Sequence, residues 1–110
     1  MVESKIHLRL KKEIGRRYKM HYNVCEEFEM FNRWADIVLF KNHRLFAIIE
    51  CKNKQFEKEL FQKFEYWRSK GIKCNFMVFS VPTKNLEKQR KRFEKRGIFY
   101  EELNLEGYSK

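Results

Sequence analysis

The chain has 110 residues, enough for one domain with its own core but too few for a core plus a separate catalytic module. Its 25 Lys and Arg residues against 15 Asp and Glu give a formal net charge of +10, which favours a polyanionic partner such as nucleic acid. With 43% hydrophobic residues the chain is too apolar to be disordered. We therefore expect residues 1–110 to form a single folded domain.

The cysteines and the N-terminal sequence together predict the cellular compartment of the protein. Cys25, Cys51 and Cys74 are odd in number and widely spaced, with no CxxC pair, which predicts buried free thiols in a reducing environment. The first residues lack the hydrophobic region of a signal peptide, and no apolar run approaches the ~20 residues of a membrane helix. We expect a soluble, intracellular and cytoplasmic protein without membrane contact, or one in the host cytoplasm if the chain is viral.

The N-terminal segment, from Ser4 to about Arg17, predicts a helix with Ser4 as its N-cap. Three residues at i, i+4 and i+8 form its apolar stripe: Ile6, Leu10 and Ile14. His7 and Glu13 flank the stripe, so each lies at the edge of a packed interface or faces a site beside the sheet. Gly15 predicts that the helix frays or ends nearby.

Residues 20–30 alternate between apolar and polar side chains, which predicts a half-buried strand. An acidic cluster of Glu26, Glu27 and Glu29 stands out in so basic a chain. Its first interpretation is a solvated strand end. The alternative is an extra ligand for a metal or water next to Asp36.

Two apolar, β-rich runs follow at residues 35–40 and 45–49. The four residues between them, 41–44, predict a hairpin turn in which Asn42 takes a positive φ. We expect the two runs to pair as antiparallel strands.

Asp36 opens the first run and Glu50 closes the second, with Lys52 two residues later. Because strand side chains alternate, Glu50 and Lys52 should point to the same face, and the hairpin can bring Asp36 beside them. Two carboxylates at the end of a buried hairpin suit a divalent metal better than a core.

Residues 54–70 return to helical spacing and Gly71 is a natural stop. The apolar stripe of this helix consists of Phe56, Phe61 and three further residues: Leu60, Phe64 and Trp67. Gln62 and Tyr66 fall on the other side of the helix. That polar face either contacts nucleic acid or is only solvated.

Residues 73–81 form a near-continuous apolar run, as in a strand covered on both faces and parallel to the 45–51 strand. A last helix should begin after Thr83 or Asn85 and run through Arg96, with Gly97 closing it. Its surface is strongly basic and includes Lys88 and Arg92, which predicts either contact with a phosphate backbone or a solvated face. Residues 98–100 can add an edge strand, and the tail to Lys110 should be irregular.

The expected fold is α/β, with an αβββαβ core, a mixed central sheet flanked by helices, and an extra basic C-terminal helix. This order, with Asp36 on one strand and Glu50-Cys51-Lys52 on the next, resembles the PD-(D/E)XK nuclease superfamily over about residues 4–81. The resemblance implies that Asp36, Glu50 and the backbone carbonyl of Cys51 hold Mg²⁺ or Mn²⁺. It also implies that Asp36, Glu50 and Lys52 are catalytic.

Further matches are more specific to RecB-type and Holliday junction resolvase-like members. Gln62 and Tyr66 match the Q-x-x-x-Y pattern of such members, which implies a role in binding substrate. An acidic residue or His on the first helix of many members could be Glu13 or His7. The first-strand Glu of some subfamilies could be Glu26, Glu27 or Glu29, and the Pro that precedes the motif Asp is replaced by Ala35.

The expected function is therefore a Mg²⁺-dependent nuclease that hydrolyses DNA phosphodiester bonds, as an endonuclease, with RNA as an open alternative. The main alternative is a catalytically inactive nucleic-acid-binding module of the same fold. Another is an assembly factor whose basic surface meets acidic proteins. Because small nucleases that cut both strands often work as two-fold dimers, we also expect a homodimer.

Overall fold

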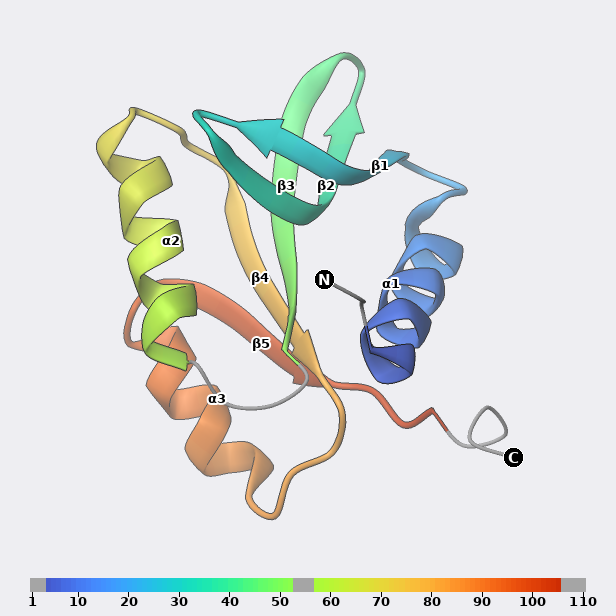
Figure 1. Ribbon diagram of the computed structural model, residues 1–110, viewed down its shortest axis with the longest axis vertical. Helices are drawn as coiled ribbons and strands as arrows, with labels where there is room; N and C mark the ends of the chain where they lie inside the picture. Colours follow the sequence, from blue (N-terminus) through green and yellow to red (C-terminus); the bar gives the residue numbers. More distant parts are fainter. Residues whose placement is uncertain (1–3, 53–56, 106–110) are drawn as a thin grey trace.

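The structure is a computed structural model that describes residues 4–52 and 57–105, and it has the expected α/β fold (Figure 1). Along the chain the elements are α1 (Lys5–Tyr18), β1 (Asn23–Met30), β2 (Arg33–Lys41), β3 (Arg44–Lys52), α2 (Glu57–Ser69), β4 (Asn75–Ser80), α3 (Leu86–Glu94) and β5 (Ile98–Glu102). The order αβββαβ and the extra C-terminal helix are thus confirmed. The predicted helix start at residues 54–56 and the irregular tail at 106–110 lie outside the described residues.

The five strands form one mixed sheet in the order β1-β2-β3-β4-β5. The first three strands pair antiparallel, whereas β4 pairs parallel to both β3 and β5. The parallel pairing of β3 and β4 confirms the prediction from the strand-helix-strand order. The predicted short strand at 98–100 is also confirmed, and it extends to Glu102.

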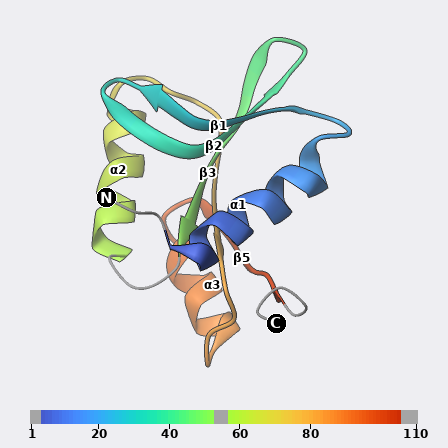
Figure 2. The ribbon, with the colours of Figure 1, turned by 45° about the vertical axis from the view of Figure 1, so that its right-hand side comes forward.

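Helices cover both faces of the sheet, with α1 on one side and α2 and α3 on the other (Figures 1 and 2). The core under α1 contains Leu10 and Ile14 of the helix, packed against Ile37 and Ile49. The core on the opposite face is largely aromatic, and its fully buried rings are Phe64, Trp67, Phe93 and Tyr100. Burial on both faces explains why the central strands are apolar with little alternation.

Local signals in the sequence account for several element ends. The Ser4 side chain accepts a hydrogen bond from the His7 N–H at 3.1 Å, and Asn85 caps α3 in the same way. In the β2–β3 turn, Asn42 and His43 have φ values of 52° and 64°, as a tight hairpin requires. The prediction of a positive φ at Asn42 is confirmed.

Some boundaries and burials differ from the expectations. Strand β1 begins at Asn23 rather than at Met20, because the chain turns after Tyr18. Helix α3 ends at Glu94 instead of Arg96, and the chain then turns into β5 at Gly97. None of the three cysteines forms a disulfide bond, and only Cys51 is buried, while Cys25 and Cys74 are half-buried.

Helix α1 includes Gly15 and ends at Tyr18, one residue beyond the predicted end at about Arg17. Replacing Gly15 with Ala is expected to raise the free energy of unfolding by about 0.5–1 kcal/mol, because Ala loses less backbone entropy in a helix. A Cβ at Gly15 would lie 3.9 Å from the nearest atom, on Val24, which is an ordinary contact. Urea unfolding measures the change. Gly71→Ala is the contrasting variant and should destabilise, because Gly71 has a φ of +87°.

No helix within the described ranges is both long and apolar enough to cross a membrane.

Candidate functional site

The candidate site lies where β2 and β3 stop pairing through their backbones. The pairing runs from the hairpin turn to Ile37 opposite Ile49. At the next position, the side chains of Asp36 and Glu50 accept hydrogen bonds from the backbone of the opposite strand. The Asp36 N–H donates to Glu50 Oε2 at 3.0 Å, and the Cys51 N–H donates to Asp36 Oδ2 at 2.8 Å. Each carboxylate is thus bound to the backbone of the opposite strand, so the structure brings Asp36 and Glu50 together at this split.

A sharp twist at Asp36 makes this arrangement possible. Ile37 packs in the core under α1, yet Ala35, two residues away, packs in the core under α2. In a regular strand these two side chains would share a face. The reversal occurs level with Glu27 of β1, which has a φ of 51°. The Asp36 side chain, at this reversal, faces His7 of α1.

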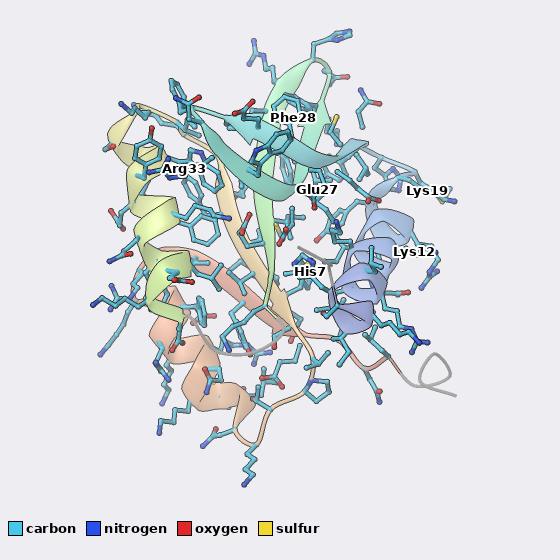
Figure 3. The ribbon with its side chains drawn as sticks, viewed as in Figure 1. His7, Lys12, Lys19, Glu27, Phe28 and Arg33 are labelled. Atoms are coloured by element: carbon cyan, nitrogen blue, oxygen red, sulfur yellow. The ribbon has the colours of Figure 1, made fainter. Side chains whose placement is uncertain are left out.

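A histidine and a lysine flank the acid pair from opposite sides of the sheet. His7, labelled in Figure 3, extends from α1. Its Nε2 lies 3.1 Å from Asp36 Oδ2. Lys63 Nζ of α2 donates to Glu50 Oε1 at 2.7 Å and to the Trp34 carbonyl at 3.0 Å. The site therefore spans the sheet, with one acid approached from α1 and the other from α2.

Glu50 is the most strongly perturbed acid of the site. It is 2% exposed, and burial is the main reason why its pKa rises from 4.5 to about 7. The charge of Asp36 raises the pKa further, whereas the Lys63 ammonium opposes part of the rise. A carboxyl with a pKa near neutrality gains much from an added cation, because the cation favours its charged form.

Cys51 and Lys52 complete the predicted motif. The Cys51 side chain is buried in the core under α1, so its thiol lies away from Glu50. Its N–H points into the gap between β2 and β3, and the C=O of a strand residue points to the same neighbouring strand as its N–H. Lys52 ends β3 and is half-buried. The alternation of strand side chains places Lys52 on the Glu50 face.

The two predicted accessory acids of β1, Glu27 and Glu29, lie in different surroundings. Glu27 lies level with Asp36, but its carboxylate binds the Lys11 ammonium of α1 at 2.6 Å. Lys11 is one helical turn beyond His7, so α1 presents two side chains to two neighbouring strands. Glu29 is exposed and pairs with Trp34 across the β1–β2 hairpin.

Glu13, the other candidate on α1, binds Arg16 and Arg17 of its own helix at 2.5 and 3.0 Å. These partners lower the pKa of Glu13. Of the two α1 candidates, only His7 contacts Asp36.

The predicted substrate-binding residues lie on α2 and α3, and their described contacts are with residues other than Asp36 and Glu50. Gln62 and Arg92 line a groove of about 580 Å³ between α2 and α3, and Arg92 also forms an ion pair with Glu57. Lys88 is exposed on α3. Tyr66 donates its hydroxyl to the Phe31 carbonyl at 2.9 Å, which ties α2 to the β1–β2 turn.

Lys63 was missed by the sequence interpretation, although it contacts Glu50. It lies between Gln62 and Phe64, and it follows Leu60 by three residues and precedes Trp67 by four. That spacing places it on the edge of the apolar stripe that packs against the sheet. The contact between Lys63 and Glu50 could have been predicted from a lysine at the edge of this stripe, because the stripe faces a strand that ends in a buried acid.

The donor set suits Mg²⁺, since Mg²⁺ prefers oxygen ligands and usually takes one or two carboxylates plus waters and phosphate oxygens. Asp36, Glu50 and the Cys51 carbonyl would supply such oxygens. Across residues 4–52 and 57–105, no three or more His, Cys, Asp or Glu side chains gather as a ready metal cage.

Comparisons of the chain with protein-family models, curated proteins and solved structures found no match.

Proposed function

We propose that this protein is a metal-dependent nuclease that hydrolyses DNA phosphodiester bonds, as an endonuclease. The observation that carries the proposal is the Asp36–Glu50 pair, in which each acid is bound to the opposite strand at a split in the sheet. Placing the buried Glu50 carboxylate beside the half-buried carboxylate of Asp36 is costly unless a cation compensates them. The net charge of +10 supplies the attraction for a polyanionic substrate.

Mg²⁺ or Mn²⁺ at this pair would supply positive charge to the scissile phosphate and lower the pKa of a bound water. The residues of the chain have separate tasks. His7 holds Asp36 in place from α1, and Lys63 neutralises Glu50 from α2. Lys52, at the end of β3, orients the attacking water and balances the charge that develops on the phosphate.

The second candidate is a DNA-binding module of the same fold without catalysis. It is favoured by one observation, the ion pair between Lys63 and Glu50, which already provides the buried acid with a cation. Both candidates use the same basic surface, so cleavage is what separates them.

The test is cleavage of linear, circular, single-stranded and branched DNA with Mg²⁺, Mn²⁺ or EDTA. We expect cleavage that EDTA abolishes and that Lys52→Met lowers by a factor on the order of 10². Lys84→Met is the matched control, because it removes the same charge from an exposed loop. DNA binding by both variants should stay within about threefold of wild type.

If no DNA is cut with either metal but binding persists, the binding module is the correct function. If Lys52→Met cuts as fast as Lys84→Met, Lys52 has no role in the reaction. Gel filtration of the same samples tests the proposed homodimer.

A further inference from the structure

Lys63 of α2 forms an ion pair with the buried acid of the candidate site. Its ammonium lies 2.7 Å from Glu50 Oε1, and the Asp36 N–H donates to Glu50 Oε2 at 3.0 Å, so each oxygen of this carboxylate has a partner. The Glu50 side chain is 3% exposed, whereas that of Lys63 is 28% exposed. A carboxylate buried to this degree is costly without a cation beside it.

Lys63 compensates Glu50 without help from a second side chain. Within residues 4–52 and 57–105, it is the only residue that forms an ion pair with Glu50. His7 approaches from the opposite side of the sheet and contacts Asp36 instead. Asp36 adds negative charge beside Glu50. In the absence of a metal ion, the Lys63 ammonium is therefore the positive charge that Glu50 depends on.

A metal ion held by the acid pair would meet this ammonium at close range. Like charges at such a range repel strongly at a buried site. A divalent ion has the advantage over the ammonium, because it brings two positive charges to the carboxylates of Asp36 and Glu50, whereas Lys63 brings one. Lys63 and a divalent ion are thus competitors for Glu50.

The Lys63 ammonium keeps other partners when it leaves Glu50. It donates to the Trp34 carbonyl at 3.0 Å and lies 5.7 Å from the centre of the Trp67 ring. A carbonyl oxygen and an aromatic face both stabilise an ammonium. The stem of a lysine is flexible, so the exchange requires the rotation of one side chain and leaves the strands in place.

We propose that Lys63 is a built-in counter-ion, which balances Glu50 in the free protein until a divalent ion replaces it there. The inference rests on the proposed function, since it concerns the metal that the acid pair binds. It makes Lys63 a residue that sets the metal affinity of the site: its charge keeps the metal-free site stable and lowers the affinity for the metal.

The test is a titration with Mn²⁺ in the absence of DNA and at one fixed pH, in which the EPR signal of free Mn²⁺ reports binding. Lys63→Met is expected to bind Mn²⁺ about tenfold more tightly than the wild type, because it removes a positive charge from the site. Lys63→Gln retains an N–H donor without the charge and should behave in the same way. Asp36→Asn combined with Lys63→Met should lose the gain, which would place the ion at the acid pair.

Lys58→Met is the matched control, because it removes the same charge from an exposed position of α2. Its affinity for Mn²⁺ should stay within about twofold of that of the wild type, since solvent and salt screen exposed charges. Protons also bind Glu50 more tightly without Lys63. The divalent ion gains about twice as much as the proton, because the Coulomb energy scales with charge, so the expected direction is unchanged.

Thermal unfolding gives a second readout. In EDTA, the Tm of Lys63→Met should lie below that of the wild type, because a buried acid has lost its partner. Saturating Mn²⁺ should then raise the Tm of Lys63→Met by more than it raises that of the wild type.

Equal or weaker Mn²⁺ binding by Lys63→Met and Lys63→Gln would show that Lys63 does not compete with the metal, and would overturn the inference. An absence of Mn²⁺ binding by all variants would overturn it as well. The proposed function is decided separately, by cleavage. DNA cleavage by the wild type with unchanged Mn²⁺ affinities would refute the inference alone, and tighter binding by Lys63→Met without cleavage would refute the nuclease alone.

Discussion

Replacing Asp36 with Asn is expected to lower the rate of DNA cleavage by a factor on the order of 10³ while the protein stays folded. Asn keeps an oxygen that can accept the Cys51 N–H, which Asp36 accepts at 2.8 Å, so the split between β2 and β3 is preserved. It removes the negative charge that the proposed metal requires. The measurement is single-turnover cleavage of a labelled DNA with Mg²⁺.

Glu59→Gln is the matched control for Asp36→Asn, because it also changes an acid to its amide but on the exposed side of α2. It should cut at the wild-type rate. A circular dichroism spectrum separates loss of chemistry from loss of fold. Unchanged cleavage by Asp36→Asn would remove Asp36 from the site and with it the basis of the proposed function.

As the pH rises from 4.5 to about 7, the free energy of unfolding of the metal-free wild-type protein is expected to fall, relative to that of Glu50→Gln, by on the order of 3 kcal/mol. In the unfolded chain the carboxyl has its ordinary pKa of 4.5, whereas burial raises the pKa of folded Glu50 to about 7. Within this window the folded protein holds a proton that the unfolded chain has released. Raising the pH therefore favours unfolding, and the stabilisation is complete only below pH 4.5.

Urea unfolding at a series of pH values measures this difference. The amide of Glu50→Gln does not titrate, so the variant should lack that part of the pH dependence. Glu26→Gln, on an exposed position of β1, should follow the wild-type curve. Above pH 7, Mg²⁺ should raise the Tm of the wild type and leave that of Glu50→Gln nearly unchanged, because a ligand stabilises the state it binds. Parallel curves for wild type and Glu50→Gln would contradict a buried, titrating Glu50.

The strand and helix order could be predicted because each element carries its own local signal. Ser4 and Asn85 mark helix starts, and Asn42 marks the tight turn between β2 and β3. The acid pair was also predictable, since a charged residue at the end of an apolar strand is unusual wherever the strand lies. These signals depend on residues near one another in the sequence.

The surroundings of the acid pair could not be predicted in the same way. A helical wheel gives the face of α2 on which Lys63 lies. It does not give the position of α2 along the strands of the sheet, and that position determines that Lys63 contacts Glu50. Glu27 shows the same limit, since its neighbour across the sheet is Asp36 and its ionic partner is Lys11 of α1. The reversal at Asp36 lies level with Glu27, which has a left-handed backbone, a conformation that Glu does not signal in a sequence.

The two bonds made by the single ammonium of Lys63 imply a thermodynamic linkage between neighbouring sites. The Trp34 carbonyl and the Glu50 carboxylate share this donor, at 3.0 and 2.7 Å. A ligand that shifts the hairpin backbone at Trp34 would alter the electrostatic environment of Glu50. The affinity of Glu50 for a proton or a metal ion would change with it. Linkage is reciprocal, so ion binding at Glu50 must alter the affinity of the hairpin for that ligand by the same factor.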